Sequence, residues 1–132
     1  MNRYLTAAAL VVGLAATPAA AQNLQGQWLH TEPMPTGGNF SVTVAFAPGG
    51  ALQYEMAVPG NPQNNGFGAG ITRCEGTYQV SGGNLATRWA NCNQCGSMGC
   101  VGVATNAIPF GGPVQFLNQD SMTISGGRFS RQ

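Results

Sequence analysis

The sequence predicts an all-β domain, a single small antiparallel up-and-down β-barrel of about eight strands that is linked by disulfides. Beyond residue 21, no window sustains the i, i+3, i+4 apolar spacing of an amphipathic helix. Short segments of alternating apolar and polar residues recur instead, and turn residues separate them. The 20 glycines and 8 prolines of the chain are spread along it, as tight turns require. Strands joined by short turns stay neighbours, and closing them into a barrel removes exposed strand edges.

The first half of the domain is expected to form one strand and one hairpin. Residues 25–30 are the first strand. Apolar residues then alternate with polar ones over 40–46 and again over 52–58, on either side of the turn Pro48-Gly49-Gly50. Residues 59–70, rich in Gly, Pro and Asn, are interpreted as a long loop.

The second half is expected to form another hairpin followed by short strands. Residues 71–80 and 85–92 are the arms about the turn 81–84, and residues 93–100 are interpreted as a loop. The remaining strands are expected at 101–108, 114–118, 121–125 and 128–131. In an up-and-down barrel the loops 59–70 and 93–100 then emerge at one end, with the tight turns at the other.

The register of the second hairpin separates an inner from an outer face. Gly76 faces Trp89 and leaves space for the indole, while Arg73, Glu75 and Arg88 share the outer face. We interpret these three charges as a solvated ion pair of Glu75 with its arginine neighbours, which contributes little to stability.

Residues 1–21 resemble a secretory signal. Arg3 supplies a positive start, residues 5–16 are apolar, and Ala19-Ala20-Ala21 fits the cleavage pattern. We therefore expect the domain to be residues 22–132 and its location to be periplasmic or secreted. The apolar stretch is too short to span a membrane, which takes about 20 residues.

The charge balance excludes several classes of partner. The chain has 5 basic and 4 acidic residues, and loss of Arg3 with the signal leaves no net charge. Nucleic acids and anionic membrane surfaces select for a basic excess, so we expect neither as a partner. We expect a monomer.

The four cysteines, Cys74, Cys92, Cys95 and Cys100, are expected to form two disulfides, because an even count in an exported chain implies them. The hairpin register puts Cys74 opposite Asn91, and a bulge at Asn91 would bring Cys74 beside Cys92. We favour Cys74–Cys92 with Cys95–Cys100, and the other two pairings remain open.

The sequence also offers candidate residues for a metal site and for a catalytic site. Cys92, Cys95 and Cys100, with Met98 and His30, would be a soft ligand set for Cu(I), although compartment and fold favour structural disulfides and no metal or cofactor. For catalysis, one histidine and four carboxylates are few candidates, and no serine lies in a G-x-S-x-G turn. We therefore expect no enzyme activity.

Gly26-x-Trp28 at the start of the first strand, followed by a meander of strands, resembles the lipocalin-like (calycin) barrels. The resemblance implies that Trp28 packs across one end of the barrel and that an arginine of the last strand lies against it. Arg131 matches that arginine, with Arg128 as the rival. The short chain is also similar in size to avidin-type barrels and to small exported bacterial inhibitors of metalloproteases.

Two functions follow from this resemblance. The first is a binding protein that holds a small apolar or aromatic ligand in the barrel. Its expected wall and lid residues are Phe40, Val42, Val44, Tyr54, Met56, Phe67, Trp89 and Phe116. The second is an inhibitor of a secreted or periplasmic protease or lysozyme. It would act through a loop or through residues 22–36, where Pro33 and Pro35 hold the chain extended. A filled barrel favours the inhibitor, and an open one favours ligand binding.

Overall fold

A computed structural model describes residues 24–35, 37–60 and 69–132. The expected signal segment, residues 1–21, and the expected lid residue Phe67 lie outside the described residues.

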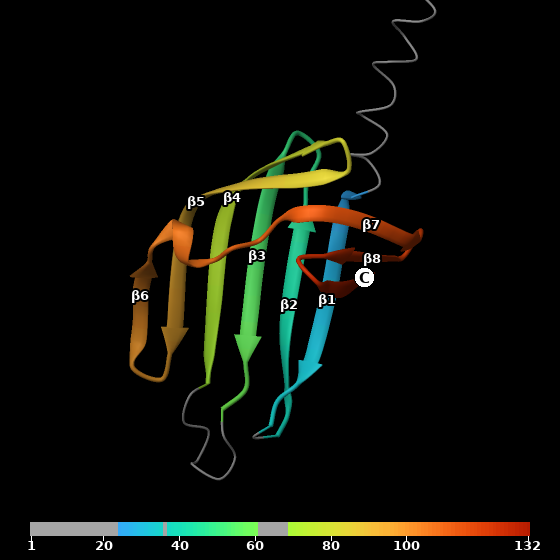
Figure 1. Ribbon diagram of the computed structural model, residues 1–132. Coiled ribbons are helices and arrows are strands. Elements are labelled where there is room, and N and C mark those ends of the chain that lie inside the picture. Colours follow the sequence, from blue (N-terminus) through green and yellow to red (C-terminus); the bar gives the residue numbers. More distant parts are fainter. Residues whose placement is uncertain (1–23, 36, 61–68) are drawn as a thin grey trace, which may run out of the picture.

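The described chain is all-β, as predicted, and its neighbouring strands are antiparallel (Figure 1). Eight strands close into a barrel in the order β4-β3-β2-β1-β9-β8-β7-β5, and β5 pairs back with β4. The ninth strand, β6, pairs with β5 outside this ring. The strands are β1 Gly26–Pro33, β2 Asn39–Phe46, β3 Ala51–Val58, β4 Gly70–Ser81, β5 Asn84–Gly96, β6 Gly99–Val103, β7 Gly112–Asn118, β8 Ser121–Ile124 and β9 Gly127–Arg131.

The ring closes through two short seams. β5 pairs with β7 at Asn84↔Pro113 and Leu85↔Gly112. β1 pairs with β9 at Trp28↔Arg131 and Leu29↔Ser130. β4 and β5, by contrast, pair along their whole length. The closed ring therefore occupies the upper part of Figure 1, and β1 to β6 continue below it as a curved sheet.

Residues 93–100 are not a loop, which corrects the prediction. β5 continues to Gly96, and a two-residue turn leads into β6 at Gly99. β6 ends at Val103, and the 3-10 helix η2, Thr105–Ala107, replaces the rest of the strand expected there. Glycine and cysteine content suggested a loop, but the Cys95–Cys100 disulfide joins opposite residues of the hairpin and stabilises its pairing.

The ends of the 59–70 segment and of the β5–β6 hairpin lie together, as the strand directions predicted. Val58 pairs with Gly70, and Gly70 pairs with Gly96. The structure describes only the outermost residues of the 59–70 segment.

The hairpin of β4 and β5 has the predicted register near its turn, with Val80 opposite Leu85 and Gly76 opposite Trp89. The bulge lies at Ala90 rather than at Asn91, since Glu75 pairs with Asn91. The role of Gly76 also differs from expectation. A Cβ atom there would lie 2.1 Å from the carbonyl oxygen of Arg88, so the glycine makes room for the β5 backbone rather than for the indole.

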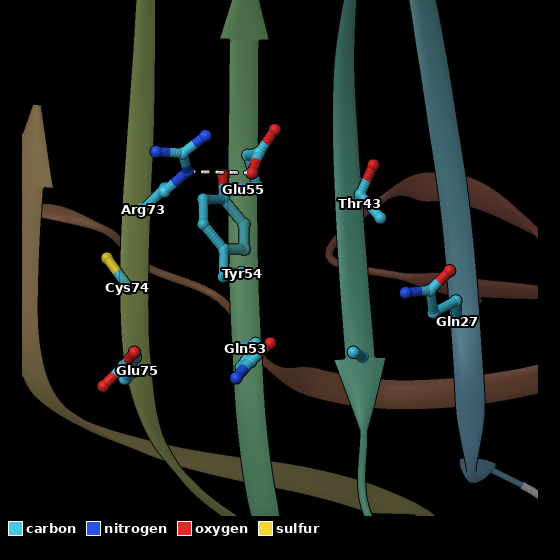
Figure 2. A pocket seen from close by; sticks show the side chains of 9 residues that line it. Gln27, Thr43, Gln53, Tyr54, Glu55, Arg73, Cys74 and Glu75 are labelled. Carbon is cyan, nitrogen blue, oxygen red and sulfur yellow. Dashed lines mark hydrogen bonds and ion pairs between the residues drawn. The ribbon is translucent and has the colours of Figure 1, made fainter. Parts of the chain in front are cut away.

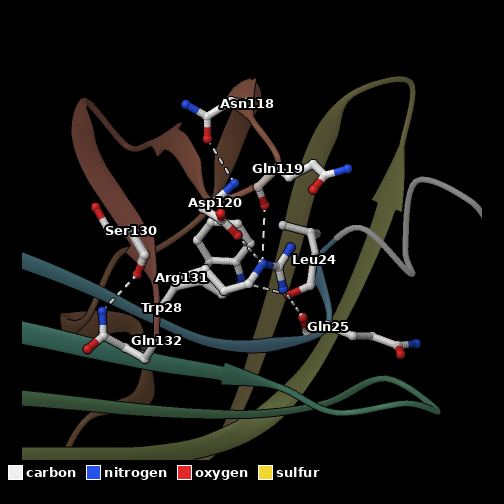
Figure 3. Close-up of polar contacts among 9 residues, drawn as sticks. All are labelled: Leu24, Gln25, Trp28, Asn118, Gln119, Asp120, Ser130, Arg131 and Gln132. Atoms are coloured by element: carbon white, nitrogen blue, oxygen red, sulfur yellow. Dashed lines mark hydrogen bonds and ion pairs between the residues drawn. The ribbon is translucent and has the colours of Figure 1, made fainter.

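Trp28 and Arg131 meet at the β1–β9 seam (Figure 3). Trp28 is fully buried, and its Nε1 donates a hydrogen bond to the carbonyl of Leu24 at 2.7 Å. The Arg131 guanidinium carbon lies 4.2 Å from the centre of the Trp28 ring. Its Nη1 donates to the carbonyl of Gln25 at 2.6 Å and its Nε to that of Gln119 at 3.1 Å. One side chain thus ties the last strand to residues on both sides of the seam.

We predict that Arg131→Met lowers the free energy of unfolding by about 3 kcal/mol. The substitution keeps an apolar stem over Trp28 but removes a cation–π contact and charged hydrogen bonds to two carbonyls. Urea unfolding followed by tryptophan fluorescence measures the effect. Arg88→Met, at an exposed arginine, is the control and should stay within about 0.5 kcal/mol of the parent. Equal losses in both variants would contradict the role given to Arg131.

Candidate functional site

Aromatic side chains fill the interior of the ring. Tyr54 and Trp89 are buried, with ring centres 5.6 Å apart. Phe110, from the segment between η2 and β7, lies 5.6 Å from Tyr54 and 6.0 Å from Phe129. The segment is held by its backbone, because Trp89 Nε1 donates to the carbonyl of Ile108 at 2.8 Å. Phe110 therefore acts as a plug that leaves the ring interior packed.

Space remains beneath this plug, at the mouth of the ring. The cavity there has a volume of about 190 Å³. We call it the mouth cavity. β1, β2, β3, β9, the 109–110 segment and the turn between β8 and β9 all contribute to it. Its lining residues are His30, Glu32, Val42, Tyr54, Pro109, Phe110, Ile124, Ser125, Gly126, Gly127 and Phe129. Its lining thus combines aromatic and aliphatic side chains with polar groups in comparable share.

His30 and Glu32 form the polar edge of the mouth cavity. His30 Nδ1 lies 2.7 Å from the carbonyl oxygen of Arg128, and Nε2 lies 2.9 Å from Glu32 Oε1. Because a carbonyl oxygen only accepts, His30 Nδ1 is the donor in the contact with Arg128, and Nε2 faces the Glu32 carboxylate. The ring packs between Phe40 and Phe129, and the absence of a side chain at Gly127 leaves it room.

Glu32 and Tyr54 offer polar atoms to a ligand. The Glu32 side chain is 53% exposed, against 13% for His30, so the carboxylate can accept a further hydrogen bond. The Tyr54 hydroxyl has no hydrogen bond to a described residue, yet it is not sealed from solvent. Burial raises the pKa of Tyr54 above 10.0, because desolvation disfavours the phenolate. The hydroxyl therefore stays protonated and can donate.

The structure brings only part of the expected ligand wall to the mouth cavity. Val42 and Tyr54 line it. Val44 and Trp89 are core residues, and Phe40 and Met56 are partly buried against that core. The remaining described wall residue, Phe116 on β7, is 38% exposed, and its ring lies 6.3 Å from that of Trp28, away from the mouth cavity.

Phe110 and Phe129 were missed as wall residues by the sequence analysis. The sequence does indicate that Phe110 is buried, because a large apolar residue stands between Pro109 and Gly111, where a solvent-exposed turn usually has a polar residue. Phe129 alternates with the polar residues Arg128 and Ser130, as an inward residue of a strand does.

A second depression, of about 270 Å³, lies on the outer face of β1 to β4 (Figure 2). Polar side chains dominate it, and Arg73 Nε donates to Glu55 Oε2 at 3.0 Å. This corrects the predicted partner of Arg73, because Glu55 stands directly opposite on β3. Both side chains are largely exposed, so the ion pair contributes little. Because Tyr54 is the one aromatic residue among its lining residues, this depression is the weaker candidate for a small aromatic ligand.

All four cysteines are bonded, Cys74 to Cys92 and Cys95 to Cys100, which is the pairing the sequence favoured. The copper alternative therefore has no free thiolate. Among the described residues, no group of three or more His, Cys, Asp or Glu side chains could hold a metal ion.

No family model matches the chain, and no curated protein or solved structure matches it. Within the described ranges, no helix is long and apolar enough to cross a membrane.

We predict that the two tyrosines of residues 24–132, Tyr54 and Tyr78, ionise above pH 10 in the folded protein. Desolvation raises the pKa of both, so each contributes stability below pH 10 that is lost as the pH rises through its folded-state pKa. Absorbance at 295 nm during a pH titration measures the ionisation. Denaturant should return the midpoint to about 10, and Tyr54→Phe should remove one of two high-pH steps. A midpoint at or below 10 in the folded protein would contradict this picture.

Proposed function

We propose that the chain is an exported, lipocalin-like barrel that binds one small ligand with an apolar or aromatic body at the mouth cavity. The observation that carries the proposal is the pairing of aromatic walls, from Tyr54, Phe110 and Phe129, with polar groups at one edge. Binding sites for small molecules combine these features, because apolar walls supply affinity and a few polar groups fix the orientation.

The size of the cavity limits the ligand. Its 190 Å³ is below the roughly 300 Å³ at which drug-sized ligands are accommodated. Because Phe110 plugs the ring interior, such a ligand would rest at the mouth rather than deep in the barrel. A single aromatic ring with a short polar substituent fits this space.

The polar edge favours a ligand that carries a hydrogen-bond donor. Glu32 is an exposed carboxylate and accepts only, while His30 is already engaged on both nitrogens. An amine or hydroxyl on the ligand would satisfy Glu32, and the aromatic walls favour a cationic amine further.

Export is supported by the disulfides, which indicate an oxidising, non-cytoplasmic compartment. The expected signal segment, the periplasmic or secreted location and the lipocalin-like kinship stand as parts of the proposal.

A protein inhibitor is the second candidate, and two observations favour it. The first is the packed ring interior, which is the outcome expected of an inhibitor, so the ligand proposed above would bind at the mouth cavity and not inside the ring. The second is an exposed hairpin tip. Met98 is 99% exposed at the tip of a hairpin that the Cys95–Cys100 disulfide holds in place. Exposed, rigid apolar tips suit insertion into another protein's cleft. The N-terminal segment is less suited, because Gly26–Pro33 is paired along its length with β2.

We predict that small aromatic amines, with phenethylamine as the probe, bind the purified domain and that Glu32→Gln weakens this binding about tenfold. The lost interaction is a hydrogen bond to a charged group, and 1.4 kcal/mol corresponds to a factor of ten. Titration of tryptophan fluorescence measures the affinity. Toluene tests the apolar wall and should bind both proteins equally.

Glu75→Gln, on the outer face, is the matched control and should leave the affinity unchanged. Native mass spectrometry of protein purified from its producing cell adds an independent readout, because a retained small ligand appears as added mass. Absence of binding by both probes, together with a bare native mass, would overturn the proposal in favour of the inhibitor.

A further inference from the structure

β6 is an edge strand with one open side. It lies outside the ring at the margin of the molecule (Figure 1), where β5 is its partner. Among the described residues, no strand pairs with its other edge. An open edge carries unpaired N–H and C=O groups, which another extended strand can bind.

The strand pairing identifies these groups. Opposite residues of an antiparallel pair alternate between hydrogen-bonded pairs, with Cα atoms about 5.5 Å apart, and non-bonded pairs at about 4.5 Å. Cys95 and Cys100 are opposite one another with Cα atoms 4.0 Å apart, so they are a non-bonded pair. Gly102, two residues further along β6, forms a non-bonded pair of the same kind with Asn93. The backbone N–H and C=O groups of Cys100 and Gly102 therefore point to the open edge.

This edge lacks the usual protection against association. Native edge strands are blunted by charged side chains, proline or bulges. β6 has none of these, since its sequence is GCVGV and its register with β5 is regular. No charged residue occurs anywhere from Trp89 to Gln119. The exposed large apolar residues of the described chain all lie within the same stretch, and they are Met98, Val101, Phe116 and Leu117.

We propose that two copies of the chain pair through this edge, antiparallel about a twofold axis at Val101. In that register Cys100 of each copy is opposite Gly102 of the other, and four backbone hydrogen bonds form. Val101 is then opposite Val101 of the second copy as a non-bonded pair, the closer kind, so the two side chains pack together. Val101 is 64% exposed in the single chain, and this contact covers it.

A second copy suits the edge better than an unrelated chain for two reasons. The positions of the open groups are self-complementary about Val101, as a twofold interface requires. The uncharged stretch also meets itself without like-charge repulsion. The contact is short, and interfaces below about 1,200 Å² are weak, so we expect a concentration-dependent dimer in place of the monomer expected from the sequence.

Cysteine cross-linking tests the axis. Val101→Cys should give a disulfide-linked dimer on mild oxidation, because the two Cα atoms would lie about 4.5 Å apart. Ser97→Cys, in the turn of the same hairpin, is the matched control. Its two copies would lie more than about 15 Å apart in this register and should not cross-link. Non-reducing electrophoresis with peptide mapping reads the result. Equal cross-linking of the two variants, or none in either, would overturn the proposed register.

Sedimentation velocity tests the association without an added cysteine. The parent domain should pass from monomer to dimer with a Kd below about 1 mM, the weak end of specific association. Val101→Lys puts two like charges opposite one another and should raise this Kd at least tenfold. Val101→Thr keeps a β-branched, uncharged side chain and should stay within threefold of the parent. A parent that remains monomeric at about 1 mM, or a lysine variant that associates as the parent does, would show that the edge does not pair with itself.

Discussion

The barrel depends on the contact between Trp28 and Arg131. β1 and β9 share only two residue pairs, and that short seam alone would hold the ends of the ring weakly. The guanidinium over the indole adds a cation–π contact, and its hydrogen bonds reach Gln25 before β1 and Gln119 between β7 and β8. Closing the ring at this place also brings His30 of β1 beside Arg128 and Gly127 of β9. The polar edge of the mouth cavity is thus a consequence of the seam.

The packed interior of the barrel explains why the cavity lies at the mouth of the barrel and not inside it. Buried aromatic side chains fill the interior of the barrel. Phe110 adds a further aromatic side chain from a segment that is not a strand. The side chains of Trp89 and Thr87 donate hydrogen bonds to the carbonyl oxygens of Ile108 and Phe110, which fixes the plug to β5. The mouth cavity lies beside this plug, between side chains of β1 to β3 on one side and β8, β9 and their connecting turn on the other. The candidate site is thus the space that the plug and the β8–β9 turn leave between them.

Local signals predicted much of this fold. The Gly82-Gly83 turn fixes which residues of β4 and β5 are opposite, and that register led to the Cys74–Cys92 pair. Structural features that depend on contacts between residues far apart in the chain could not be predicted from the sequence. The β5–β6 hairpin has the composition of a loop and is a strand pair because of its disulfide and turn. Phe110 belongs to a turn by sequence, and hydrogen bonds from Trp89 and from Thr87, which lies 23 positions before it, hold it at the ring interior. The cavity beside His30 and Glu32 could not be predicted either, because strands far apart in the chain form it.

Chemical-shift mapping tests the central claim, that the mouth cavity binds small aromatic ligands, most directly. The ¹⁵N-labelled domain, residues 22–132, would be titrated with phenethylamine and each backbone amide followed by NMR. The structure predicts that the largest shifts cluster at residues 30–32, 110–111 and 125–129, which surround the mouth cavity. Shifts centred on the outer depression at residues 53–55 and 73–75, or on the hairpin tip at 97–99, would contradict the account.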